Sequence, residues 1–306
     1  MRQAEDVRPL GKLDFEWVRE RGIPLALALA FAFVTLARVV GAIRFDTLGI
    51  DARIYRLAAA AALSGQDPWA QQDLFRFAGT PPSLLLFLPA AYLSEIITVV
   101  AYGAAFAVVG FLVLRRLELP VWWILFPPLA ESISTVNQDV LVLWLLLMAS
   151  AWAGLAVVCK TYAIVPLVLQ GRWRAAVVGA VLSLITLPLW ITFLQRRDEI
   201  TRLLTEQADG GLSAWGTWWL FVPTVIALYG LRGRGASWLV IPALWPATQL
   251  HYSLLALPVA RRSPILAFLL CFANPLLPAV AVIIECLRVR VLPEALAAFR
   301  ERSAPD

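Results

Sequence analysis

The stretch GIDARIYRLAAAAALSGQDPWA, residues 49–70, places an aspartate in a segment that otherwise has the alanine-rich composition of a helix. Asp51 and Tyr55 are four positions apart, so they share one face of that helix. A carboxylate in such a place could act as a general base that takes a proton from a hydroxyl group. The simpler interpretation is a solvated loop charge, with Asp51 paired to Arg53 or Arg56. These residues alone leave both interpretations open.

A second set of polar residues interrupts apolar segments further along the chain. Lys160 lies between AGLAVVC and TYAIVPLVL, where a charge costs about 2.5–3.5 kcal/mol on insertion scales. That cost favours a functional role over a side chain that extends from a helix end to the interface. His251, the single histidine, is either functional or the polar partner in a helix contact. Asn137 and Gln138 fit a cavity and hydrogen bonds between helices equally well.

The spacing of acidic residues and cysteines does not indicate a metal site. The three cysteines stand singly in apolar runs, without a CxxC pair or a Cys/His cluster. Asp46, Asp67 or Asp73 could supply a second acid or bind a metal, but their spacing is not that of metal ligands. We therefore expect neither a metal nor another cofactor.

The composition is that of a polytopic helical membrane protein. The chain is 60% hydrophobic and 15% charged, whereas soluble domains contain about 25% charged residues. Several apolar runs, such as 175–193, are long enough to cross about 30 Å of hydrocarbon. The net charge of +5 comes from small arginine clusters between these runs, as in cytoplasmic loops. With no long basic run to follow phosphates, nucleic acid is excluded as a partner.

Assigning every basic cluster to the cytoplasm predicts the path of one domain, residues 1–306, with about 10–12 transmembrane helices, some of them short. The segment between Arg116 and Arg172 is too short for four full spans, so we expect four short or broken helices there. The predicted parts are a cytoplasmic N-terminus (1–21) with an in-plane helix at Leu13–Arg21, a first span (22–43), an outer loop of interfacial helices (44–95), a returning span (96–114), an outgoing span (175–195), a polar outer loop (196–213), a returning span (214–231), two short hairpins (236–260 and 264–287) and a cytoplasmic tail (288–306).

This path has a consequence for the polar residues. It brings Asp51, Gln138, Lys160 and His251 to the outer side, and polar groups gathered on one side of a bilayer indicate a single cavity. Arg196 and its neighbour also fall outside, against the tendency of basic residues to stay in the cytoplasm.

Three segments, in the same order, resemble the integral-membrane glycosyltransferases of the GT-C class. They are most similar to glycosyltransferase family 87, the polyprenyl-phosphate-mannose-dependent mannosyltransferases. The first segment runs from Asp51 through Tyr55 and GQDPW to FRFAGTPPSLLLFLP, the second from Gln138 through Lys160 to Arg174, and the third is WPATQLHYSLLALPVA. The resemblance implies a GT-C-like fold and covers about half of the chain.

The resemblance also implies roles for individual residues. Asp51 matches the loop aspartate that serves as general base, and Lys160 and His251 match positions near the lipid phosphate or the sugar. The remaining implied substrate-binding residues are Tyr55, Asn137, Gln138 and Tyr252.

The chemistry of transfer from a lipid phosphate agrees with these roles. A carboxylate must remove the acceptor proton, and positive charge must stabilise the leaving phosphate. Asp51 could do the first, and Lys160, His251, Arg53 or Arg56 the second. A single carboxylate with a phosphate leaving group implies one displacement with inversion.

The resulting prediction is a hexosyltransferase of the bacterial-type inner membrane with its active site on the extracytoplasmic side. It would move a sugar, most simply mannose, from a polyprenyl-phosphate donor to a glycolipid or glycan acceptor, with membrane lipid around it. The alternatives are a non-enzymatic transporter or flippase for a lipid or solute, and an inactive relative that acts as a scaffold.

Overall fold

The computed structural model describes residues 18–70, 76–207, 213–246 and 249–291, and every regular element within these ranges is a helix. The predicted all-α fold is therefore confirmed for the described part of the chain. Residues 13–17 of the expected in-plane helix and residues 292–306 of the expected tail lie outside the described residues.

Three helical segments within these ranges are long and apolar enough to cross a membrane, with mean hydropathies of 2.2, 2.4 and 2.2. Each agrees with a span expected from the sequence. They are Glu20–Arg44, Glu95–Arg116 and Trp173–Gln195. The first comprises the end of η1 (Val18–Gly22) and α2 (Ile23–Arg44), the second is α4 (Glu95–Arg116), and the third comprises α9 (Trp173–Ser183), η7 (Leu184–Thr186) and α10 (Leu187–Gln195).

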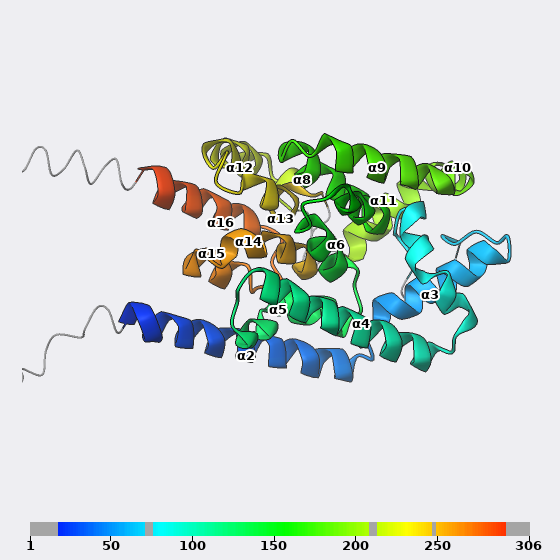
Figure 1. Ribbon diagram of the computed structural model, residues 1–306, viewed down its shortest axis with the longest axis horizontal. Helices are drawn as coiled ribbons and strands as arrows, with labels where there is room; N and C mark the ends of the chain where they lie inside the picture. The colour runs from blue at the N-terminus through cyan, green and yellow to red at the C-terminus, as the bar shows by residue number, and fades with distance from the viewer. Residues whose placement is uncertain (1–17, 71–75, 208–212, 247–248, 292–306) are drawn as a thin grey trace, which may run out of the picture.

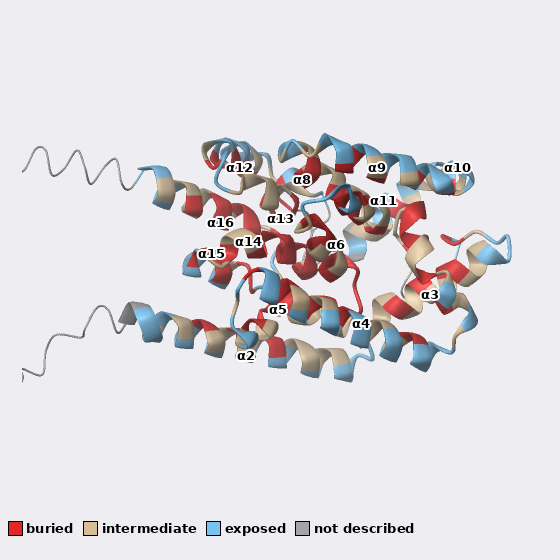
Figure 2. Cartoon of the chain, in the orientation of Figure 1, coloured by how far each residue is buried: buried red, intermediate tan, exposed pale blue. Residues whose placement is uncertain are grey.

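These long helices lie on the outside of the bundle, as Figures 1 and 2 show. Their outward faces are apolar and exposed; Phe33 of α2 and Ile96 of α4 are each 75% accessible. Such continuous apolar surface is unusual on a soluble protein and is matched by lipid tails. The chain is a helical membrane protein.

The interior consists of shorter helices. Between Arg116 and Arg172 the chain forms α5 (Pro127–Ser134), α6 (Asp139–Leu146), α7 (Leu155–Cys159) and α8 (Ile164–Leu169), which confirms the expectation of four short helices. Short 3-10 turns precede or join them, namely η4 (Val121–Leu125), η5 (Ala151–Gly154) and η6 (Thr161–Ala163). Most residues of α6 are buried (Figure 2), as are half of those of α5. The turn between these two helices carries Asn137 and Gln138, and the turn after α7 carries Lys160.

The segment that follows α2, expected from the sequence as an outer loop of interfacial helices, is a folded unit. It contains α3 (Ile50–Leu63), η2 (Pro81–Phe87) and η3 (Pro89–Tyr92), at the end of the bundle opposite to both ends of the described chain (Figure 1). As GQDPW predicts, α3 ends at Leu63 and Gly65 takes a left-handed φ of 72°. The buried face of α3 includes Tyr55, Ala58 and Ala59, so small residues let the helix pack closely.

The prediction of a polar outer loop at 196–213 is wrong for most of its length. Residues Arg197–Gln207 form the helix α11, and residues 208–212 lie outside the described ranges. Arg196 forms ion pairs with Asp67 and Glu199, and Glu199 also pairs with Arg76 at 3.1 Å. These contacts join α11 and the end of α10 to the segment that follows α3 and give arginine a structural role here.

The C-terminal part completes the bundle with short elements, namely η8 (Ala214–Gly216), α12 (Trp218–Gly230), η9 (Ala236–Trp238), α13 (Val240–Leu244), η10 (Leu250–Ala256), α14 (Leu257–Ala260), α15 (Pro264–Leu269), α16 (Leu277–Cys286) and η11 (Leu287–Val291). Two arginines connect parts that are distant in sequence. Arg261 donates to the carbonyl of Leu117, and Arg290 donates to the carbonyl of Gly230 at 2.9 Å. Each of these two arginines therefore joins two helix ends by donating to a backbone carbonyl.

Candidate active site between two cavities

Asp51 is fixed by the way α3 begins against the end of α5. The first N–H groups of a helix have no partner within it, and here they donate to carbonyls of the α5 terminus. Gly49 N bonds Ser134 O at 2.8 Å, and Asp51 N bonds Thr135 O at 3.0 Å. The close approach requires glycine at position 49, whose φ is 65° and whose Cβ would lie 2.5 Å from a methyl group of Val99. A backbone built in this way determines where the Asp51 carboxylate points.

Asn137 holds that carboxylate from the turn between α5 and α6. Its Nδ2 donates to Asp51 Oδ2 at 2.9 Å, and its Oδ1 accepts from the backbone N–H of Asp139 at 3.0 Å. The second bond fixes the orientation of the amide, since only the oxygen can accept. The preceding residue, Val136, has a φ of 60°, which costs a β-branched residue about 1–3 kcal/mol. The turn thus keeps a strained backbone that aims Asn137 at Asp51.

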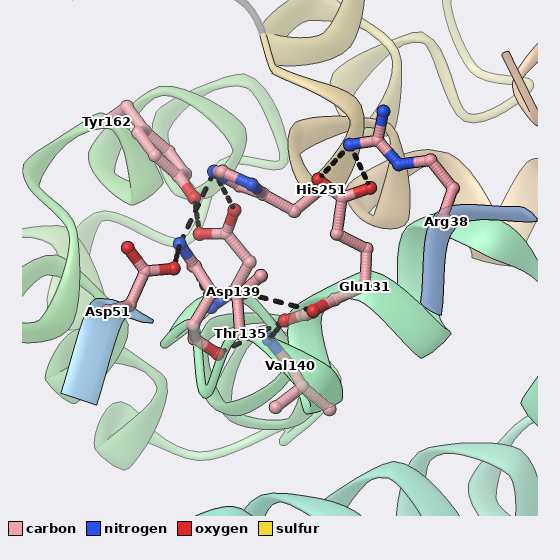
Figure 3. A network of polar contacts seen from close by, with 10 residues as sticks. Arg38, Asp51, Glu131, Thr135, Asp139, Val140, Tyr162 and His251 are labelled. Carbon is pink, nitrogen blue, oxygen red and sulfur yellow. Dashed lines mark hydrogen bonds and ion pairs between the residues drawn. The ribbon is translucent and has the colours of Figure 1, made fainter. Parts of the chain in front are cut away.

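His251 extends this network to Asp139, beside which it lies in Figure 3. Its Nε2 lies 3.4 Å from Asn137 Nδ2 and 3.5 Å from Asp139 Oδ2. Tyr162 donates its hydroxyl to Asp139 Oδ1. His251, Asp139 and Tyr162 are all buried, so the network is shielded from water and its hydrogen bonds are strengthened.

Lys160 approaches from the turn between α7 and η6, where its backbone is extended. Its Nζ lies 5.8 Å from the centre of the Tyr252 ring, a cation–π distance. Within the described residues this ammonium makes no hydrogen bond or ion pair. The carboxylates of Asp139 and Asp51 attract this ammonium at longer range, and a half-buried cation that makes no close ion pair can bind an anion.

Two cavities meet at Asp51. The larger has a volume of about 760 Å³ and is lined by the C-terminal half of α2, the end of α5 and α11 together with His251. The smaller, of about 140 Å³, is lined by Tyr55, Asn137, Lys160 and Tyr252 among others. Asp51, Ile54 and Gln249 border both cavities. A carboxylate in this position can contact two different molecules, one in each cavity.

The remaining predicted residues lie elsewhere. Gln138 is buried and donates to Ser83 O at 3.2 Å, which is a packing contact, and it borders neither cavity. Arg53 and Arg56, expected as phosphate ligands, also border neither cavity. Their guanidinium groups face Glu95 instead, with Arg53 Nε 3.2 Å from Glu95 Oε1 and Arg56 Nη2 4.0 Å from Glu95 Oε2. They connect α3 to α4.

The ion pair of Asp51 with Arg53 or Arg56, considered from the sequence, is absent among the described contacts. Arg53 pairs with Asp46 at 3.0 Å, and its hydrogen bonds hold the pKa of the exposed Asp46 carboxyl below the ordinary value. Asp46 and Asp67 are therefore engaged by arginines, and Asp73 lies outside the described residues. In the described ranges, no three histidine, cysteine or acidic side chains gather as metal ligands would.

Several residues of the site were not predicted. Asp139, Tyr162 and the ion pair between Arg38 and Glu131 belong to it (Figure 3). Arg38 carried a signal in the sequence, because a charge inside the first span is costly and has to find a partner. Glu131 lies 93 positions away, and sequence spacing alone does not reveal that pairing.

Comparisons with protein-family models, with curated proteins and with solved structures find no match to this chain. The resemblance to glycosyltransferase family 87 therefore stays a prediction that rests on the three sequence segments.

Proposed function

We propose that the protein is a membrane glycosyltransferase that moves a sugar, most simply mannose, from a polyprenyl-phosphate donor to a hydroxyl of a lipid- or glycan-linked acceptor. The observation that carries the proposal is the position of Asp51 between two cavities, of which only the smaller contains Lys160. This transfer needs two groups. One is a base that contacts both the donor and the acceptor, and the other is a cation near the donor phosphate.

In the proposed reaction, Asp51 takes the proton of the acceptor hydroxyl while that oxygen attacks the anomeric carbon of the donor sugar. The bond between that carbon and the phosphate oxygen breaks, and its electron pair leaves with the phosphate. The Lys160 ammonium stabilises the charge that develops on the phosphate. Attack from the face opposite the leaving group inverts the anomeric configuration.

The two oxygens of Asp51 suit this role in different ways. Oδ2 accepts the 2.9 Å bond from Asn137, which orients the carboxylate. Oδ1 has no hydrogen-bond partner among the described residues, and the carboxylate borders both cavities. A positioned carboxylate with one open oxygen can reach a hydroxyl without losing its support.

The membrane setting supports a lipid-linked donor. The apolar faces of α2 and α4 are exposed to lipid, so the polyprenyl chain can stay in the bilayer while its phosphate reaches the site. We propose that the short helices complete a GT-C-like bundle of about 10–12 membrane segments in an inner membrane. The site then opens to the extracytoplasmic side.

The test uses membranes that contain the full chain and labelled polyprenyl-phosphate-mannose, with the glycosylated lipid as readout. Loss of a general base lowers rates by about 10²–10⁴-fold, and we expect D51N to fall in that range. D46N is the matched control, because it removes an exposed carboxylate that borders neither cavity. Wild-type activity in D51N would reject the base assignment. Protein-dependent lipid translocation without a glycosidic product would support a transporter instead.

A further inference from the structure

The larger cavity differs from the smaller one in charge and in the kind of hydrogen bond that it offers. Among the described residues, its charged lining residues are Arg38, Asp51, Glu131 and Glu206, which are one cation and three carboxylates. Those of the smaller cavity, counted over the same part of the chain, are Asp51, Arg76 and Lys160, which are two cations and one carboxylate. Two cavities that share Asp51 therefore favour ligands of different charge.

The cation of the larger cavity is already engaged. Arg38 Nη2 lies 2.7 Å from each carboxylate oxygen of Glu131, and this pair is one helical turn from the hydroxyls of Ser134 and Thr135 on α5. Glu206 lines the same cavity from α11 and has Arg202 3.7 Å away. An anion that approached Arg38 would have to compete with Glu131 for the guanidinium group, and breaking a half-buried ion pair is costly.

The wall of the larger cavity is rich in acceptors. Ser134 and Thr135 donate their hydroxyl hydrogens to the backbone carbonyl of Glu131, which leaves their oxygens to accept. The carboxylates of Asp51 and Glu131 are acceptors as well. A ligand that fits such a wall carries many O–H donors and no negative charge near the wall, as the ring of a neutral sugar does.

We propose that the larger cavity is the acceptor site of the transferase and that the Arg38–Glu131 pair makes it select an uncharged polyhydroxylated head group over an anionic one. The assignment of this cavity to the acceptor rests on the proposed function. The preference for an uncharged head group is a binding property of the cavity itself. The acceptor hydroxyl would reach Asp51 from the α2–α5 side while the donor phosphate lies near Lys160.

The test is equilibrium binding to the full chain in nanodiscs, without donor. The probes are hexyl mannopyranoside and the corresponding hexyl mannopyranosiduronate, which differ only at C6. We expect the wild type to bind the neutral probe about tenfold more tightly, since a hydrogen bond to a charged group accounts for roughly one such factor. Equal or tighter binding of the uronate would overturn the proposal.

Variants locate this preference. E131Q removes one carboxylate from the wall of the cavity and from the ion pair with Arg38, so we expect the neutral-to-anionic ratio to fall to about threefold or less. E285Q is the matched control, since Glu285 is a buried, arginine-paired carboxylate on α16 that borders neither cavity; its ratio stays at the wild-type value. An unchanged ratio in E131Q would overturn the assignment to this pair.

Two further readouts keep the outcome unambiguous. If E131Q does not fold, T135V replaces it, because it removes one acceptor oxygen from the same wall; we expect weaker binding of both probes, which share the ring hydroxyls, and unchanged binding of both would overturn the assignment of the sugar to this wall. The binding experiment contains no donor, and sugar transfer is measured separately in membranes. A wild type that transfers sugar but does not distinguish the two probes would reject this inference alone. Selectivity without any transfer rejects the proposed function and leaves the cavity assignment standing.

Discussion

The side-chain amide of Asn137 donates a 2.9 Å hydrogen bond to the carboxylate of Asp51, from a turn 86 positions further along the chain. The same amide accepts from the backbone N–H of Asp139 through its oxygen. Asn137 therefore acts as a rigid spacer between the base and the backbone of α6. A spacer of this kind fixes the direction of the carboxylate more firmly than a water molecule would.

Removing this spacer is expected to slow the reaction more than it weakens binding. In N137A the Asp51 carboxylate loses its donor and samples several rotamers, so we expect kcat for mannosyl transfer to fall about 10–100-fold while KM for the donor changes little. A steady-state analysis in membranes separates the two parameters.

The control for this variant is N274A. Asn274 makes the same local bond, from the N–H of Leu276 to its Oδ1 at 2.9 Å, but in the turn before α16. Its kcat is expected to equal that of the wild type. A rise in the donor KM of N137A with unchanged kcat would show that Asn137 binds the substrate directly and does not position Asp51.

Replacing Lys160 is expected to affect the donor above all. K160M removes the cation that lies in the smaller cavity, so we expect KM for polyprenyl-phosphate-mannose to rise at least about tenfold and kcat to fall as well. K160R keeps the charge and is expected to recover part of the loss, limited by the different shape of the guanidinium group. If K160M and K160R are equally impaired, shape and not charge is what Lys160 supplies.

Much of the architecture follows from the sequence because it depends on local patterns. Apolar runs of the right length predict Glu20–Arg44, Glu95–Arg116 and Trp173–Gln195 as membrane helices. The short distance between two arginine clusters predicts the broken helices α5 to α8. Both inferences use only chain length and the thickness of hydrocarbon.

The candidate site is less accessible from the sequence because its contacts are long-range. The sequence indicates functional roles for Asp51, Lys160 and His251 because they are polar residues in apolar surroundings. It does not show that Asn137 and Asp139 contact this set, because those contacts depend on which helix ends meet in the fold. Phosphate binding by the two arginines of α3 stays a prediction, and the sequence did not reveal that Glu95 at the start of α4 lies beside them in the folded chain.

The helix α11 was missed although its sequence carries a signal. Ile200, Leu203 and Leu204 recur at helical spacing within RDEITRLLTEQ, which is typical of an amphipathic helix. Its high charge suggested a loop instead. In the structure, Leu203 borders the larger cavity and Leu204 the smaller, so this helix forms a wall of the site.

The attachment of α11 makes a prediction about Arg196. R196Q breaks the ion pairs with Asp67 and Glu199, and we expect faster amide hydrogen exchange over Arg197–Gln207 together with weaker binding in both cavities. R197Q is the matched control: Arg197 is exposed and pairs only with its neighbour Asp198 among the described residues, and such surface pairs contribute little. Equal exchange in R196Q and R197Q would mean that apolar packing alone holds α11.

Packing inside the bundle is testable at the crossing of η5 and α9. A Cβ on Gly154 would lie 2.4 Å from the carbonyl oxygen of Ala175 and 2.8 Å from the nitrogen of Gly179. Because both are backbone atoms, G154A must push the two segments apart, and overpacking of this kind costs about 1–3 kcal/mol. We expect a lower midpoint in thermal unfolding of the detergent-solubilised protein.

G103A serves as control, since its Cβ would meet only Val136 at an ordinary 3.6 Å and alanine favours the helix by about 0.5–1 kcal/mol. An unchanged midpoint in G154A would contradict the close crossing.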